Sequence, residues 1–325
     1  MSRTPLLKSG LFKSGAALAL ISALALTGCA REDSASSFPN RPIEMVIPYP
    51  AGSGTDTVSR LIAETVNAEG DLGEKIQVVN RDGGNGTVGT SAVANAKANG
   101  YTIGMLPDGP LTLVPHVEKL SFDPDKLDLL TTVVESSVMI VVPASAPYKS
   151  LDDLFAAAKA NPGKLTMGEG PLNYTVPLNM IERTVDVDFK SIPVDGDGSS
   201  VTALLGKNLD ASMMQLAGAL PHLKAGKLRA LGIMSPEANP LAPEIPTFAS
   251  QGFDLKWAAF YVVAAPAGLP DDIHDKLTEA FTNAVKSDKF VKAAGDMGMT
   301  ASASTGAEAA AAVKEKYDLA AEYLK

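Results

Sequence analysis

The residues best suited to chemistry lie in one short stretch, Pro48–Asp56, with the sequence PYPAGSGTD. Gly52 and Gly54 carry no Cβ atom, so the backbone here can approach a ligand closely. Ser53 and Thr55 add hydroxyl groups between the two glycines. Known phosphate motifs do not match, because a P-loop needs a lysine after its last glycine and a dinucleotide fingerprint needs a third glycine. The turn therefore has the residues of a close backbone approach to a ligand, but not those of a phosphate motif.

The elements on either side of this stretch must position it. Residues 43–47 alternate apolar and polar side chains and then turn apolar, which predicts a strand entering a core. Apolar residues at helical spacing from 58 to 66 predict a helix that begins near Asp56 or Thr57. The unpaired N–H groups and partial positive charge of a helix start suit an anion. The alternative is an ordinary strand-to-helix connection capped by Asp56 or Thr55.

The same arrangement of strand, turn and helix is repeated along the chain. Residues 75–80 and 101–106 predict two more strands, followed by the turns Arg81–Gly86 and Pro107–Pro110. Successive units of this kind indicate a parallel sheet, with its turns gathered at the carboxyl ends of the strands. Ligands of open α/β sheets bind at that edge.

Two apolar runs, 138–143 (VMIVVP) and 260–265 (FYVVAA), are each followed by prolines and an acidic helix start. Matched strands of this kind are expected where a chain crosses between two domains, although two unrelated strand-turn-helix units would look similar. Between the runs, four further strands are predicted at 164–167, 189–194, 209–214 and 228–234. The predicted domains are 41–141 with 260–325, and 142–259.

Catalytic and metal-binding patterns are missing from the sequence. The three histidines are isolated, no G-x-S-x-G motif occurs, and the single cysteine is Cys29. We therefore expect no enzyme, no cofactor and no metal site. Asp152-Asp153 and Asp271-Asp272 are interpreted as helix-capping residues, because acidic side chains favour the first turn of a helix.

The N-terminus has the pattern of a bacterial lipoprotein. Residues 1–28 combine three basic residues with an apolar run of signal-peptide length, too short to span a bilayer. The run ends in LTGC, which resembles a lipobox and predicts lipidation of Cys29. Residues 29–40 are predicted to be a flexible tether.

Bulk composition limits the classes of partner. The chain of 325 residues is long enough for two domains, and 46% hydrophobic and 20% charged residues are globular values. Its net charge of −9 becomes −12 when the basic residues of 1–28 are removed. An acidic surface argues against binding to nucleic acid.

Several motifs together resemble the receptors of tripartite tricarboxylate transporters, the Bug family of solute-binding proteins. The resemblance is carried by RPI and VIPYPAG with Asp56, VNRDGGNG, PGKLT, LLGKNLD, LKAGKLRAL and APAGLP, in the expected order from Arg41 onward. It implies a two-domain α/β periplasmic-binding-protein fold, type II-like, with two crossing hinge strands and a ligand cleft between the domains.

The resemblance also implies a function. Such a receptor closes on a small carboxylate, held by backbone N–H groups, hydroxyls and water, and delivers it to large and small membrane subunits. We expect a lipid-anchored monomer outside the cytoplasm, on the outer face of the membrane or in a periplasm. A sensor of the same fold signalling to a membrane kinase is the alternative. The ligand-binding residues it implies are Tyr49, Gly52, Ser53, Gly54, Thr55, Asp56, Gly170, Asn173, Tyr174, Thr175, Asp195, Gly196 and Gln215.

The sequence departs from the family pattern in one region. Family members carry a Ser/Gly-rich turn and Ser-x-x-His where this chain has 168–175 (GEGPLNYT). Glu169 and Asp195 would place carboxylates near the cleft. Since they would oppose a di- or tricarboxylate, we expect a ligand with few negative charges or with an amino group beside its carboxylate. Asp56 is interpreted as an organiser of its turn.

Overall fold

A computed structural model describes residues 38–324. The predicted signal segment, Cys29 and residues 29–37 of the tether lie outside the described residues. Within the described part of the chain, no helix combines the length and apolar character needed to cross a membrane.

The first sheet begins with three parallel strands, as the repeated strand-turn-helix units predict. β1 (Ile43–Ile47) lies between β2 (Ile76–Asn80) and β3 (Thr102–Pro107). The sheet continues through antiparallel β9 (Ala258–Pro266) and β4 (Leu127–Pro143), and the two-residue β10 (Thr300–Ala301) pairs with β4. Short 3₁₀ helices lie in the connections: η2 (Gly84–Gly86), η3 (Val114–His116), η4 (Pro124–Lys126) and η5 (Ala249–Gln251).

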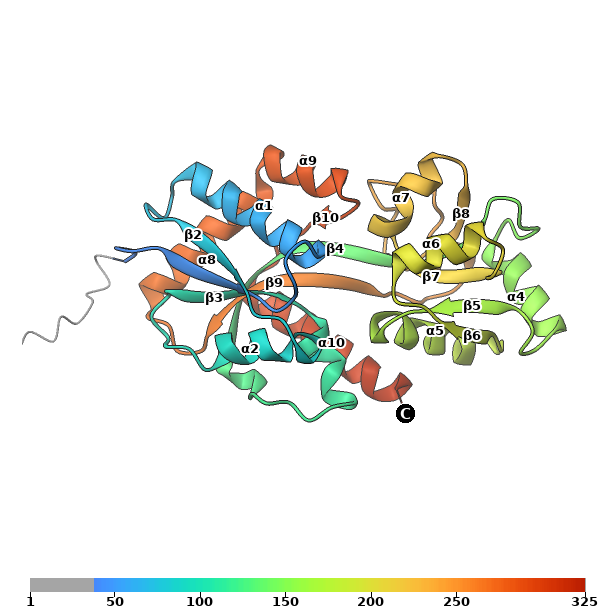
Figure 1. The fold of residues 1–325 in the computed structure, drawn as a ribbon, viewed down its shortest axis with the longest axis horizontal. Helices are drawn as coiled ribbons and strands as arrows, with labels where there is room; N and C mark the ends of the chain where they lie inside the picture. The colour runs from blue at the N-terminus through green and yellow to red at the C-terminus, as the bar shows by residue number, and fades with distance from the viewer. Residues whose placement is uncertain (1–37, 325) are drawn as a thin grey trace, which may run out of the picture. The chain divides into compact units, whose positions relative to one another are not determined.

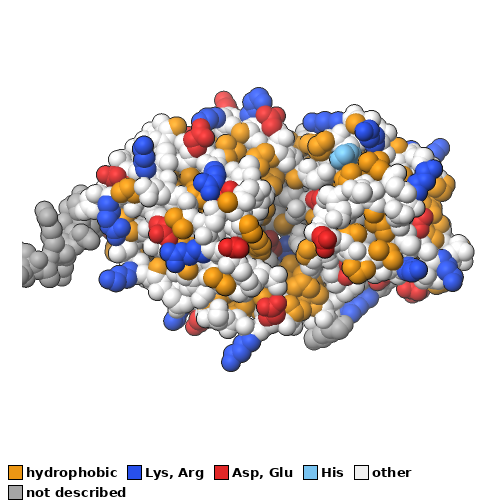
Figure 2. Space-filling view, viewed as in Figure 1, with side chains coloured by type: hydrophobic (Ala, Val, Ile, Leu, Met, Phe, Trp, Pro, Cys, Tyr) orange, Lys and Arg blue, Asp and Glu red, His pale blue; other side chains and the backbone are white. Residues whose placement is uncertain are grey.

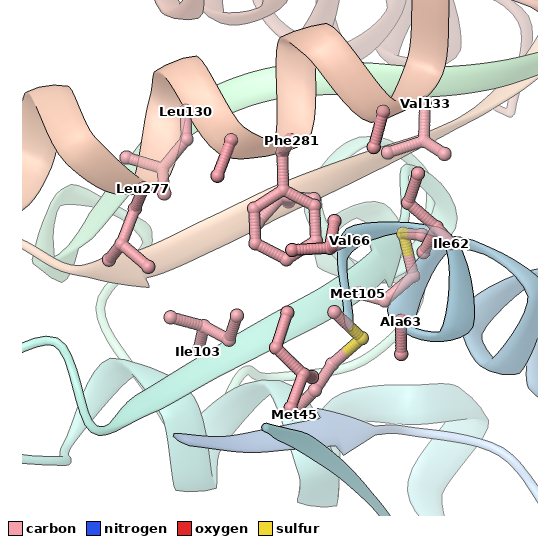
Figure 3. Packing of buried hydrophobic residues seen from close by; sticks show 14 of the residues in the cluster. Met45, Ile62, Ala63, Val66, Ile103, Met105, Leu130, Val133, Leu277 and Phe281 are labelled. Carbon is pink, nitrogen blue, oxygen red and sulfur yellow. The ribbon is translucent and has the colours of Figure 1, made fainter. Parts of the chain in front are cut away.

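Alternating side chains of these strands supply two apolar layers. Met45 faces α1 (Gly54–Glu69), α8 (Asp271–Lys286) and α9 (Asp288–Asp296), whereas neighbouring Val46 faces α2 (Thr87–Ala94) and α10 (Gly306–Tyr323). The period of two in a strand explains this division. Figure 1 shows the two groups of helices on opposite faces of the sheet, and Figure 3 shows the ring of Phe281 pointing from α8 toward the strands that carry Met45 and Ile103.

The second sheet has the order β4-β7-β5-β6, and β8 (Leu228–Ile233) also pairs with β4. β5 (Thr166–Glu169) is parallel to β6 (Lys190–Pro193) and to β7 (Ala211–Gln215). On one face of this sheet, the core residues come from α4 (Leu151–Ala160) and α5 (Leu172–Val185). The other face packs against α6 (Asp197–Leu205) and α7 (Leu216–Lys224). The short α3 (Gly109–Thr112) follows β3.

β4 connects the two sheets in one continuous strand. Its first part pairs with β9 in the first sheet, and its last part pairs with β7 and β8 in the second (Figure 1). The strand predicted at 138–143 is therefore only the end of a strand that begins at Leu127, because polar Thr131, Thr132 and Ser136 interrupt the apolar pattern while staying buried. The predicted two-domain α/β fold class is confirmed by this architecture and by its similarity to solved structures, given below.

The C-terminal helix α10 contacts elements of both sheets. Ala309 packs in the layer of β1 and β3, whereas Ala320 packs in the core of the second sheet. Asn179 of α5 donates a hydrogen bond to the carbonyl oxygen of Tyr323 at 2.7 Å. The C-terminal helix thus packs on the first sheet and also reaches the second.

Candidate functional site

The turn between β1 and α1 is built by its own side chains. α1 begins at Gly54, slightly earlier than predicted, because Ser53 is the N-cap: its Oγ accepts a hydrogen bond from the N–H of Asp56 at 3.2 Å. The predicted caps, Asp56 and Thr55, instead lie inside the helix. Gly52 has a φ of +83°, which L-residues with a side chain rarely adopt. Within residues 38–324, the N–H groups of Gly54 and Thr55 have no hydrogen-bond acceptor.

The side chain of Asp56 holds this turn in place. Its carboxylate is 3% exposed and accepts hydrogen bonds from the N–H of Gly52 at 2.9 Å and from Nδ2 of Asn80 at 2.8 Å. Arg60 forms an ion pair with it at 2.9 Å. Its carboxylate is thus occupied by partners within the chain, and Asn80 also donates to the carbonyl oxygen of Tyr49 at 3.0 Å. These contacts indicate that Asp56 organises the turn.

The same contacts make the stability of the turn depend on pH. The hydrogen bond from Arg60, with those from Gly52 and Asn80, lowers the pKa of Asp56 from 3.8 to about 2. Since the pKa is lower in the folded state, the stabilisation is present above about pH 4 and is lost as the pH falls toward 2. In urea unfolding at several pH values, the stability difference between wild type and Asp56→Asn should shrink over this range. Asp254→Asn, at an exposed side chain, is the control; a difference that does not change with pH contradicts the prediction.

Tyr49 lies over the glycine-rich turn that follows β2. Its hydroxyl donates to the carbonyl oxygen of Asn85 at 3.3 Å, and a Cβ atom on Gly86 would lie 3.1 Å from that hydroxyl. Burial raises the pKa of Tyr49 to about 12, and nearby Tyr261 and Asp108 add to the rise. The phenol is therefore neutral at physiological pH.

The predicted residues of the second sheet meet at the start of α5. Tyr174 donates a hydrogen bond to Oδ1 of Asp197 at 2.6 Å, and the N–H of Gln215 donates to the same oxygen at 3.4 Å. Burial raises the pKa of both Tyr174 and Asp197. Asp197, which the sequence did not single out, thus joins the starts of α5, α6 and α7. Gly170 packs against the ring of Tyr174, and Thr175 lies in the next position of the helix.

Glu169, Asp195 and Gly196 complete the predicted set. Glu169 ends β5 and is partly buried, Asp195 is exposed, and Gly196 is the N-cap of α6 with a φ of +132°. In the part of the chain that the structure describes, neither carboxylate has an ion-pair partner. No ion pair within the described residues therefore compensates their negative charge.

Asn173 has contacts that its sequence position did not suggest. Its Oδ1 accepts hydrogen bonds from Nε1 of Trp257 at 3.0 Å and from Nζ of Lys316 at 3.3 Å. Its backbone carbonyl oxygen also accepts from Trp257 at 3.0 Å. The side-chain oxygen of Asn173 is therefore already bound within the protein, which leaves its amide nitrogen as the group available to a ligand.

Lys316 is a buried cation that connects the two sheets. Its side chain is 7% exposed; Nζ forms an ion pair with Asp108 at 2.5 Å and donates to the carbonyl oxygen of Ala258 at 2.6 Å. It also lies 4.4 Å from the centre of the Trp257 ring. Asp108 itself accepts a hydrogen bond from the N–H of Phe260 at 3.1 Å. The spacing of Lys316 from buried Ala309 and Ala320 was the sequence signal that could have revealed it, since it places a lysine on the apolar face of a helix.

Figure 2 shows the surface hollowed between the part of the molecule that carries the first sheet and the part that carries the second, with acidic side chains on either side. We call this hollow the cleft. Within residues 38–324, no group of His, Cys, Asp and Glu side chains is arranged to hold a metal ion.

Comparisons with known proteins give a consistent identification. The family model described as "Tripartite tricarboxylate transporter family receptor" matches residues 58–320. Protein BugT of Bordetella pertussis is 31% identical over 284 residues, which are 85% of this chain and 86% of BugT. A crystal structure of a TctC solute-binding protein from Polaromonas, without ligand, is 25% identical with a TM-score of 0.80, covering 88% of this chain and 99% of that one.

A second solved structure, MatC from Rhodopseudomonas palustris with bound malate, is 25% identical with a TM-score of 0.71, covering 89% of this chain and 100% of that one. Fold and relatives define an extracytoplasmic solute-binding receptor, not an enzyme. More particularly, the chain belongs to the tripartite tricarboxylate transporter receptor family. The resemblance stated from the sequence motifs is confirmed.

Proposed function

We propose that this protein captures a small carboxylate-containing solute in the cleft and delivers it to the large and small membrane subunits of a tripartite transporter. The observation that carries the proposal is the start of α1, where the N–H groups of Gly54 and Thr55 have no acceptor among the described residues and the hydroxyls of Ser53 and Thr55 lie beside them. A carboxylate at this helix start would accept hydrogen bonds and be favoured by the helix dipole. Bound malate in MatC supports the same class of ligand.

The charges around the turn are compatible with a carboxylate ligand. Asp56 is paired with Arg60, and Asp108 is paired with Lys316, so neither adds an uncompensated negative charge. Oriented backbone N–H groups can supply positive potential without a formal cation. A net acidic receptor can therefore hold an anion through local dipoles.

Glu169 and Asp195 would then set the number of charges that the ligand can carry. Each lacks an ion-pair partner in the described residues and would repel a second carboxylate of the ligand or attract an amino group. Replacing them singly by Gln and Asn should tighten the binding of succinate, a plain dicarboxylate, by several fold. Unchanged selectivity between succinate and aspartate in both variants would contradict this role.

A thermal-shift screen of the purified protein tests the proposed function. The panel contains acetate, succinate, malate, citrate, aspartate and glutamate, with neutral sugars as the comparison. A ligand at ~100 times its dissociation constant stabilises a protein by roughly 2.7 kcal/mol. Carboxylates alone should raise the melting temperature, by several degrees. Stabilisation by sugars and by none of the carboxylates would overturn the proposal.

Several finer features belong to the same proposal. The N-terminal pattern supports lipidation of Cys29, and the receptor is proposed to act as an anchored monomer. The domains are proposed as 41–141 with 260–325, and 142–259, and closure would bend β4 and the chain entering β9. The sensor of the same fold stays a prediction, which a neighbouring kinase gene would favour over neighbouring genes for two membrane subunits.

A further inference from the structure

Tyr261 contacts the first half of the predicted site directly. It lies in β9, opposite Pro107 of β3 and Val134 of β4, so its backbone is held from both sides within the first sheet. Its hydroxyl accepts a hydrogen bond from Oγ1 of Thr55 at 3.5 Å, although the two residues are 206 positions apart. This contact places Tyr261 directly beside the turn that carries the unpaired N–H groups.

Tyr261 also interacts electrostatically with a tyrosine in each half of the predicted site. Burial is the main cause that raises the pKa of Tyr49 and of Tyr174, and the phenol of Tyr261 adds to the rise in each. Tyr49 belongs to the turn after β1, whereas Tyr174 belongs to α5 of the second sheet. Tyr261 thus interacts electrostatically with one phenol from each half of the predicted site.

The hydrogen bonds of these three tyrosines distinguish them. A phenol has one O–H donor and can also accept hydrogen bonds. The donor of Tyr49 is used by the carbonyl oxygen of Asn85, and that of Tyr174 by the carboxylate of Asp197. Within the residues that the structure describes, the hydroxyl of Tyr261 accepts a hydrogen bond from Thr55 and donates none. A partly buried donor without an acceptor is costly, unless a ligand or water satisfies it.

Tyr261 is also held rigidly. The N–H of neighbouring Phe260 donates to Oδ1 of Asp108, and the N–H of Asp108 donates to the carbonyl oxygen of Phe260 at 3.0 Å. Asp108 is in turn paired with buried Lys316. This support fixes the position of the phenol relative to the start of α1, as a specific hydrogen bond to a ligand requires.

We propose that Tyr261 binds the ligand directly, donating its O–H to the same carboxylate that the N–H groups of Gly54 and Thr55 hold; this inference rests on the proposed function. Burial raises the pKa of Tyr261, so its proton is retained at physiological pH. A neutral phenol can give a hydrogen bond to an anion without a charge partner. Because β9 belongs to the first sheet, this contact would form before the second sheet closes on the ligand.

The test is the affinity of Tyr261→Phe, which removes the hydroxyl and keeps the ring. Isothermal titration is carried out with the full chain and with each carboxylate of the panel above. For those that wild type binds, the dissociation constant should rise about 10- to 100-fold, the usual range for a hydrogen bond to a charged group. Tyr317→Phe is the matched control, since Tyr317 is 39% exposed on α10; its affinity should equal that of wild type.

A second measurement separates direct contact from a structural role. The monoamide of the best dicarboxylate, and the corresponding monomethyl ester, are titrated against wild type and Tyr261→Phe. Direct contact predicts that the variant loses more affinity for the carboxylate than for the form in which the contacted carboxylate is neutral. An equal loss for all forms, or affinity within twofold of wild type, overturns the inference while leaving the proposed function intact. If wild type binds none of the carboxylates, both fail.

Discussion

Replacing Lys316 by methionine is expected to lower the free energy of unfolding by about 3–5 kcal/mol, the usual cost of removing one member of a buried ion pair. The Asp108 carboxylate would be left buried without its counter-ion, since the two side chains are only 7% and 3% exposed. Hydrogen bonds to Ala258 and Asn173 would be lost as well. Burial lowers the pKa of Lys316, because the charged ammonium loses its hydration in the folded protein. This desolvation cost is already present in wild type.

Urea unfolding of matched variants measures this effect. Lys314→Met, on the same helix, removes an exposed ion pair with Asp318 and should cost at most about 1 kcal/mol. Asp108→Asn should destabilise as Lys316→Met does, and the double variant should recover much of the loss, because no unpaired charge remains. Additive losses in the double variant would show that the two charges do not stabilise each other.

The pair should also matter for ligand binding. A bare Asp108 carboxylate would lie beside the backbone of Phe260, next to Tyr261, and would repel an incoming carboxylate. Lys316→Met should therefore weaken carboxylate binding as well as stability, whereas Lys314→Met should change neither appreciably.

Replacing Asp56 by alanine is expected to weaken carboxylate binding at least 10-fold and to lower the free energy of unfolding by about 1–3 kcal/mol, the cost of leaving buried donors unsatisfied. The N–H of Gly52 and the amide of Asn80 would each lose the acceptor that fixes the turn. Without them, Gly52 could leave its left-handed conformation and the N–H groups at the start of α1 would no longer share one orientation.

Arg60→Ala is the appropriate comparison for Asp56→Ala. The Arg60 side chain is 51% exposed. Solvent therefore screens its ion pair with Asp56, and the pair contributes little to stability. Isothermal titration and urea unfolding should show a much smaller change for Arg60→Ala than for Asp56→Ala. Equal effects would mean that Asp56 acts through its charge pair and not through the backbone of the turn.

The sequence by itself determined the local elements and the family. The period-two strands at β1, β2 and β3, and the glycines that follow the first two of them, are visible without coordinates because strand periodicity and turn chemistry act over a few residues. The bounds of two elements differ from those that the sequence predicts. α1 starts at Gly54 because Ser53 takes the cap, and β4 extends back to Leu127 because its polar residues are buried by pairing across the sheet.

Only the tertiary structure decided which of these residues act together. Lys316 with Asp108, Tyr174 with Asp197, and Thr55 with Tyr261 each join distant segments of the chain. Sequence periodicity shows which face of an element is buried, but it carries no information about the partner on the opposing element. For this reason the sequence did not reveal that Trp257 and Lys316 bind the side-chain oxygen of Asn173, and Tyr261 was read as one more residue of an apolar strand. Long-range packing alone placed its hydroxyl beside the turn.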